Sequence, residues 1–153
     1  MQKKLHMKYS NNLFNKESHQ KFVEDSDSAI KQLFKKVSDK RRSYLDFSPD
    51  SLQELDALLR ELKKGHGTED NPLDIKEKDH WWIVRIAYYF AEVLKRNLGG
   101  HWEYGEDESS KFYRSSYISI NKNTKKIDPL LQVAASWQYG ESLFSIYEYI
   151  SSE

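Results

Sequence analysis

EKDHWWIVRIAYYFAEVLKRNL, residues 77–98, is the segment from which the rest of the chain can be placed. Between Trp81 and Leu94 a helix built from it is apolar or aromatic nearly all round, interrupted only by Arg85 and Glu92. A helix that is apolar on most sides is buried at the centre of a domain. The segment is too short and too charged to span a bilayer, which needs about 20 predominantly apolar residues. The sequence therefore predicts a buried central helix about 33 Å long.

Local signals before this segment predict two more helices. Residues 24–39 carry apolar side chains at spacings of three and four, which is typical of one helix face. Ser48-Pro49-Asp50 provides a capping hydroxyl, a proline at the first helical position and an acid near the positive end of the dipole. A helix is expected to run from there to Gly65, followed by a loop.

Two further helices are predicted after it. Asp128-Pro129 repeats the cap and proline signal, and Gly140 separates that helix from a last one. The side chains expected to face the core from these four helices are Ala29, Ile30, Leu33, Phe34, Val37, Leu52, Leu55, Leu59, Leu62, Leu130, Val133, Ala134, Trp137, Leu143, Phe144, Tyr147 and Ile150.

A change of period after the central helix indicates a small sheet. The double glycine at 99–100 ends the helix, and residues 101–104 and 117–120 then alternate between apolar and polar side chains. Ile127 is expected to close an antiparallel sheet of two or three strands. The fold class predicted is α+β, mainly helical, with about five helices around the central one. We expect residues 1–16 to be poorly ordered and residues 17–153 to form a single domain.

Composition narrows the classes of function. The chain has 153 residues, no cysteine and 24 basic against 24 acidic side chains. These values exclude a disulfide framework and a thiolate metal cluster, and they argue against a domain built chiefly to hold polyphosphate.

Residues 1–44 nevertheless hold 11 basic and 5 acidic side chains. We expect them to attract the acidic remainder within one fold, with an external anionic partner as the alternative. Lys40-Arg41-Arg42 is expected to stabilise the C-terminal end of helix 24–39.

Several short motifs together resemble a group of uncharacterised bacterial proteins of unknown function. They are LDFSP at residues 45–49, YFAEVL at 89–94, GGHW at 99–102 and IDP at 127–129. The similarity covers about residues 45–150, and Ala91 stands where a glycine is expected. The resemblance implies a shared fold and a bacterial, cytoplasmic protein, and it assigns no activity.

The residues that could carry chemistry centre on Glu92. The five histidines are scattered, and the chain lacks His-Glu-x-x-His, Gly-x-Ser-x-Gly, Walker and Rossmann motifs. No catalytic residue, metal site or cofactor is therefore predicted. An acid on a buried helix must be paired or shifted in pKa, which makes Glu92 with His101 a possible acid/base pair. The simpler interpretation is that Glu92 pairs with Arg96 at i+4.

Aromatic residues favour an interaction surface. The chain has 4 Trp, 10 Tyr and 7 Phe, and tyrosine and tryptophan often anchor protein interfaces. Trp102 and Tyr104 share a strand face and are expected to pack on the central helix, while His101 and Glu103 are expected to be exposed. The tyrosines expected to point outward are Tyr113, Tyr117, Tyr139 and Tyr149. The binding residues predicted are Glu92, His101, Trp102, Tyr104, Tyr113 and Tyr117.

The leading hypothesis is a protein-binding module of the immunity or regulatory type, without catalytic activity. Its partner is expected to be another protein, not a nucleic acid or a membrane. One alternative is an enzyme that uses Glu92 and His101 as acid and base. The other is a nucleic-acid-binding protein that uses the basic first third of the chain.

Overall fold

The computed structural model describes residues 15–64, 77–122 and 124–152. Within them the chain forms seven α-helices, a short 3-10 turn and three strands. In chain order these are α2 (Lys16–Glu24), α3 (Ser26–Lys36), α4 (Asp39–Ser43), the 3-10 turn Pro49–Ser51, α5 (Leu52–Lys64), α6 (Glu77–Leu98), β1 (His101–Tyr104), β2 (Ser116–Ile120), β3 (Lys125–Ile127), α7 (Pro129–Tyr139) and α8 (Leu143–Ser151). The predicted α+β class, mainly helical with a small antiparallel sheet, is confirmed.

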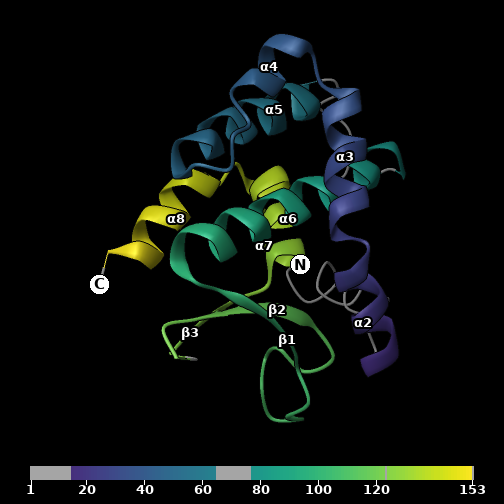
Figure 1. Cartoon of the computed structure of the whole chain (residues 1–153), viewed down its shortest axis with the longest axis vertical. Helices are drawn as coiled ribbons and strands as arrows, with labels where there is room; N and C mark the ends of the chain where they lie inside the picture. The colour runs from purple at the N-terminus through teal and green to yellow at the C-terminus, as the bar shows by residue number, and fades with distance from the viewer. Residues whose placement is uncertain (1–14, 65–76, 123, 153) are drawn as a thin grey trace.

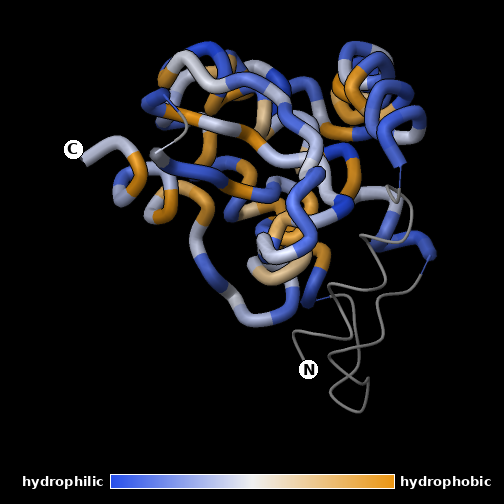
Figure 2. The backbone as a smooth tube through the Cα atoms, turned by 90° about the horizontal axis from the view of Figure 1, so that it is seen from below, coloured by the Kyte–Doolittle hydropathy of each residue, from blue (hydrophilic) through white to orange (hydrophobic). Residues whose placement is uncertain are grey.

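The helices gather around α6, with the sheet at one end (Figure 1). α6 contacts α3, α5, α7, α8 and β2, so it is covered from several sides. Hydrophobic and hydrophilic residues alternate along the surrounding helices, as expected of helices that each have one inward face (Figure 2).

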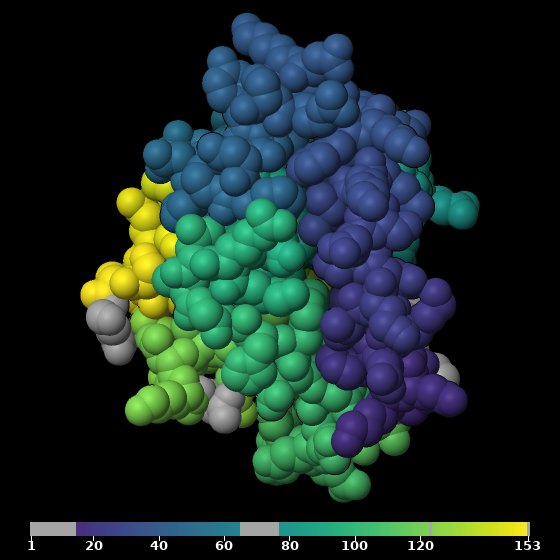
Figure 3. Space-filling model, viewed as in Figure 1, coloured from purple at the N-terminus to yellow at the C-terminus, as the bar shows by residue number. Residues whose placement is uncertain are grey.

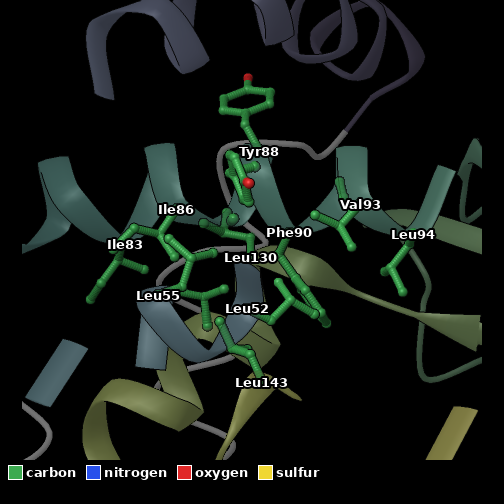
Figure 4. Packing of buried hydrophobic residues seen from close by; sticks show 14 of the residues in the cluster. Leu52, Leu55, Ile83, Ile86, Tyr88, Phe90, Val93, Leu94, Leu130 and Leu143 are labelled. Carbon is green, nitrogen blue, oxygen red and sulfur yellow. The ribbon is translucent and has the colours of Figure 1, made fainter. Parts of the chain in front are cut away.

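The burial of α6 follows from its sequence. Ile83, Ile86, Phe90, Val93 and Leu94 have no exposed surface. In the close-up view most of these side chains point toward α5, α7 and α8, whereas Tyr88 points the opposite way (Figure 4). The predicted central helix is confirmed, with its bounds.

Two tyrosine hydroxyls on α6 fix the segments that cross it. The Tyr88 hydroxyl donates to the carbonyl of Phe22 in α2 at 2.7 Å. The Tyr89 hydroxyl donates to Ser51 Oγ at 2.8 Å and accepts from the amide of Phe47 at 2.8 Å. A buried hydroxyl is costly when it lacks a partner, so these bonds select the register at which the flanking segments lie against α6.

The predicted starts of α5 and α7 are confirmed. The Ser48 hydroxyl accepts from the amide of Ser51, and the chain passes through the 3-10 turn into α5. The Asp128 carboxylate accepts from the amide of Leu131, with Pro129 at the first position of α7. α7 ends at Gly140, whose φ of 76° lies in the left-handed region that favours glycine.

The contribution of the α7 cap residue Asp128 to the stability of the fold depends on pH. Burial raises the pKa of Asp128 to about 6, although part of the residue reaches the surface, and the amide of Leu131 opposes this shift only in part. The folded state therefore binds this proton more tightly than the unfolded chain does, and the group lowers the free energy of unfolding as pH rises from about 4 to about 6.

We expect Asp128→Asn to raise the free energy of unfolding near neutral pH by about 1–3 kcal/mol, because the amide oxygen keeps the cap without the buried charge. The gain should disappear as pH falls below about 4, where the aspartate is neutral. Urea unfolding of both proteins across this pH range measures the difference. A pH-independent difference would contradict the assignment.

The sheet is antiparallel in the order β1-β2-β3. Trp102 pairs with Ile118, and Ile118 pairs with Ile127, so Ile127 closes the sheet as predicted. All five residues of β2 are buried. The strand is thus covered on both faces.

The N-terminal part differs from the prediction. The helix expected over 24–39 is the shorter helix α3, Ser26–Lys36, which the extended residue Val37 ends, and Asp25 is shared as a cap residue with the preceding helix α2. α2 was not predicted, and residues 1–14 and the loop after α5 with Gly65 lie outside the described residues. Lys40-Arg41-Arg42 lies in the last turn of the separate helix α4, and not at the end of α3.

Some charges of the basic first third are paired inside the fold. Arg41 donates to both carboxylate oxygens of Glu61 at 2.8 and 3.0 Å and to Glu54 at 3.0 Å. Lys16 forms an ion pair with Glu106 at 3.2 Å. These contacts agree with attraction between oppositely charged parts of the chain.

Of the helices that the structure describes, none is long and apolar enough to cross a membrane.

A buried carboxylate joins α5 to α8. Asp56 is 8% exposed, and its oxygens accept from the Ser142 hydroxyl at 2.7 Å and from the amide of Leu143 at 2.7 Å. The amide of Phe144 adds a longer bond at 3.4 Å. A side chain of α5 thus caps a helix whose residues lie more than 80 positions later.

We expect Asp56→Ala to lower the free energy of unfolding by about 3 kcal/mol, because it leaves amides at the start of α8 without acceptors. Asp50→Ala is a matched control, because Asp50 is an exposed carboxylate in the 3-10 turn that leads into α5. This substitution should lower the free energy of unfolding by less than about 1 kcal/mol. Chemical denaturation of the three proteins tests this. Equal losses for the two substitutions would show that the cap contributes nothing.

Candidate functional site

Glu92 lies on the edge of α6 that reaches solvent. Its carboxylate pairs with Lys95 at 3.6 Å and with Arg96 at 3.9 Å. A strip of α6 is visible at the surface between α5 and α3 (Figure 3). The simpler interpretation of Glu92, a pair with Arg96 at i+4, is confirmed.

His101 is exposed, as predicted, and its Nε2 lies 3.7 Å from Glu103. In the described part of the chain, no hydrogen bond or ion pair joins His101 to Glu92. The acid/base arrangement considered for these two side chains is therefore not assembled in this structure.

Trp102 and Tyr104 face the helices, but their main partners come from α2. The Trp102 ring packs edge-on against Phe22 at 5.4 Å between centroids, and Tyr104 lies 5.5 Å from the ring of His19. His19 Nδ1 lies 2.6 Å from Ser116 Oγ, and burial lowers the pKa of His19. Because Ser116 is buried, this serine–histidine contact ties α2 to the sheet and does not present a nucleophile.

The predicted outward tyrosines divide into two groups. Tyr117 is 8% exposed and packs against Phe112, so its outward placement was wrong, and Tyr113 is half-buried. Tyr139 and Tyr149 are exposed as predicted, and Tyr44 is an exposed ring that sequence reasoning missed.

A pocket of about 370 Å³ lies between α5 and the turn that joins α7 to α8. Leu59 and Trp137 line it but are only 4% and 3% exposed. The Lys63 ammonium lies 3.9 Å from the centroid of the Trp137 ring, within the range of a cation–π interaction. The volume suits a small ligand or one or two side chains of a partner.

Gln138 makes this pocket unusual. It lines the pocket and is 7% exposed, yet neither its amide nitrogen nor its amide oxygen has a hydrogen-bond partner in the described structure. An unsatisfied buried polar group typically costs about 1–3 kcal/mol. Both amide atoms are buried, so a partner in the pocket cannot reach them while the side chain keeps this position.

Cations predominate around the pocket. Arg60, Lys63 and Lys64 line it together with the carboxylates of Asp56 and Glu141. Asp56 is engaged by the start of α8, and Glu141 accepts from Gln132 Nε2 at 2.9 Å. Arg60 and Lys64 are exposed and form no ion pair with the described residues.

Neither chemistry nor relatives assign a reaction to this pocket. Among the described residues, no group of three or more His, Asp or Glu side chains is placed to hold a metal ion. Comparison with known protein families, characterised proteins and solved structures finds no match to this chain.

Sequence reasoning missed the pocket, although one signal was present. Gln138 follows Leu130 and Ala134 at spacings of four on the inward face of α7. A polar residue at such a position requires a partner or a function. The residues of α5 that face it come from more than 70 positions earlier, and nothing in the local pattern connects the two segments.

We expect Gln138→Met to raise the free energy of unfolding by about 1 kcal/mol, because it removes an unsatisfied amide at nearly constant volume. Gln132→Met is the matched control on the same helix, since the Gln132 amide donates to Glu141 and its loss should give no gain. Thermal and urea unfolding compare the variants. A loss of stability for Gln138→Met would mean that the amide stabilises the free protein.

Proposed function

We propose that this chain is a protein-binding module of the immunity or regulatory type, without catalytic activity, and that its partner docks at the pocket between α5 and the α7–α8 turn. The observation that carries the proposal is the pocket itself, about 370 Å³ in volume and lined by the exposed cations Arg60 and Lys64. A hollow of this size with a few charged groups at its edge is the usual form of a binding site.

Tyr139 supports a polypeptide partner. It lies between Gln138 and Gly140, both of which line the pocket, and it is 42% exposed. Tyrosine anchors interfaces because its ring contributes apolar area while its hydroxyl bonds at the rim. In the proposed interface Tyr139 thus replaces Tyr113 and Tyr117, the tyrosines predicted from the sequence.

The alternatives have less support from the structure. The enzyme hypothesis needs Glu92 close to His101, and each carries a different ion-pair partner. The nucleic-acid hypothesis needs free cations in the first third, and the pairing of Arg41, Lys16 and Lys21 with acids leaves fewer of them. Bacterial origin and a cytoplasmic location rest on the resemblance alone and belong to the same proposal.

Selection from a random-peptide display library on the whole chain tests the proposal. We expect enriched peptides whose affinity falls about tenfold in Tyr139→Ala, a loss typical of an interface anchor. Tyr149→Ala and Tyr44→Ala are matched controls, because both rings are exposed away from the pocket. No enrichment, or binders that depend on Tyr149 or Tyr44 and ignore Tyr139, would overturn it.

A further inference from the structure

We infer that α2 (Lys16–Glu24) is a releasable strap, which leaves the sheet when His19 is protonated while the helices around α6 stay packed. α2 lies beside the sheet, at the end of α3 away from α4 (Figure 1). Three observations support the inference: the few attachments of α2, the hinge at Asp25 and the hydrogen bond between His19 and Ser116. It does not rest on the proposed docking pocket.

The attachments of α2 are few. None of its residues is buried, although it contacts β1 and α3. The Phe22 ring stacks on Tyr88 at 4.5 Å between centroids and meets Trp102 edge-on, and the Phe22 carbonyl accepts from the Tyr88 hydroxyl. Lys16 and Glu106 add an ion pair between two exposed side chains, which contributes little. A segment held by so few buried contacts opens at a smaller cost in free energy than the core does.

Asp25 allows α2 to move without α3. Its φ of −79° and ψ of −4° are helical, and its side chain makes no capping bond to α3. The Asp25 carboxylate instead pairs with Lys21 inside α2 at 2.8 Å. α3 is anchored separately, because Ala29, Ile30 and Leu33 are buried in the core. A change of a few backbone angles at Asp25 therefore moves α2 and leaves α3 in place.

The bond between His19 and Ser116 depends on the charge of the imidazole. His19 Nδ1 lies 2.6 Å from Ser116 Oγ, and Ser116 is 2% exposed. This hydroxyl forms no other hydrogen bond with the residues that the structure describes. A neutral imidazole can accept the hydroxyl proton at Nδ1, which satisfies both groups. In the imidazolium both ring nitrogens are donors, so the buried hydroxyl loses its acceptor.

The surroundings of His19 favour its neutral form. Burial lowers the pKa of His19 most, Glu103 of β1 opposes this shift, and Lys16 of α2, itself paired with Glu106, adds to it. The ring of Tyr104 on β1 also faces His19, and burial raises the pKa of Tyr104, so that ring stays neutral where histidine titrates. The docked strap therefore binds the proton less tightly than released α2 does. Attachment is complete above the ordinary pKa of 6.5 and weakens as the pH falls below it.

α2 covers two of the rings that were predicted from the sequence as binding residues. Trp102 packs against Phe22 at 5.4 Å, and Tyr104 lies 5.5 Å from the ring of His19. The indole Nε1 of Trp102 is buried there without a hydrogen-bond partner in the described structure. Release of α2 exposes both rings, so the strap decides whether this aromatic surface is accessible.

Amide hydrogen exchange of the whole chain, followed by NMR and corrected for the intrinsic exchange rates, tests the inference. We expect the protection factors of α2 amides to fall about tenfold between about pH 7.5 and about pH 5, the effect of one buried donor without an acceptor. The amides of α6 should not lose protection over this range. Phe22→Ala should remove the protection of α2 at every pH while α6 stays protected.

His19→Asn is the decisive variant. The asparagine oxygen takes the place of Nδ1 and accepts the Ser116 proton at every pH, so the loss of α2 protection in acid should vanish. His101→Asn is the matched control, because His101 is an exposed histidine on β1. This substitution leaves the His19 bond in place, and the loss of protection in acid should remain.

Exchange of α2 amides only together with those of α6 would overturn the inference, because α2 would then open only on global unfolding. An unchanged loss of protection in His19→Asn, or its disappearance in His101→Asn, would overturn it as well. Neither result bears on the display selection at the pocket, so the inference and the proposed function fail separately.

Discussion

The fold depends on one constraint, which is that α6 is apolar on almost every side and must be covered along most of its surface. A single neighbouring helix cannot do this, so α3, α5, α7, α8 and the sheet each take one part of its surface. The two hydroxyls of Tyr88 and Tyr89 then limit how those segments lie, because each needs a partner in the dry interior. Apolar burial thus assembles the helices, and a few polar bonds set their register.

The sequence predicted best those helices whose first residues include their own capping side chain. The starts of α5 and α7 rest on Ser48, Asp128 and the prolines that follow them, which act within four residues. The break between α2 and α3 has no such signal, since Asp25 keeps a helical conformation and no glycine or proline interrupts the chain. Tyr117 was misplaced for a related reason. Alternation along a strand indicates an exposed face only when one face meets solvent, and β2 is covered on both.

The candidate site could not be located from local pattern, because it exists only where the end of α5 meets the α7–α8 turn. Glu92 and His101 were conspicuous in the sequence, yet their partners are the nearest available charges. Gln138 was inconspicuous, and its amide is one of several buried polar groups for which the described structure shows no hydrogen-bond partner.

The bond network of Asp56 has a consequence for biosynthesis. While the polypeptide emerges from the ribosome, α5 and α6 are complete long before residues 142–144 leave the exit tunnel. Until then the Asp56 carboxylate has no helix to cap and the inner surface of α6 lacks the cover of α7 and α8. The nascent chain must therefore pass through a stage with exposed apolar surface, to which a chaperone can bind. Folding becomes cooperative only when α7 and α8 have been synthesised.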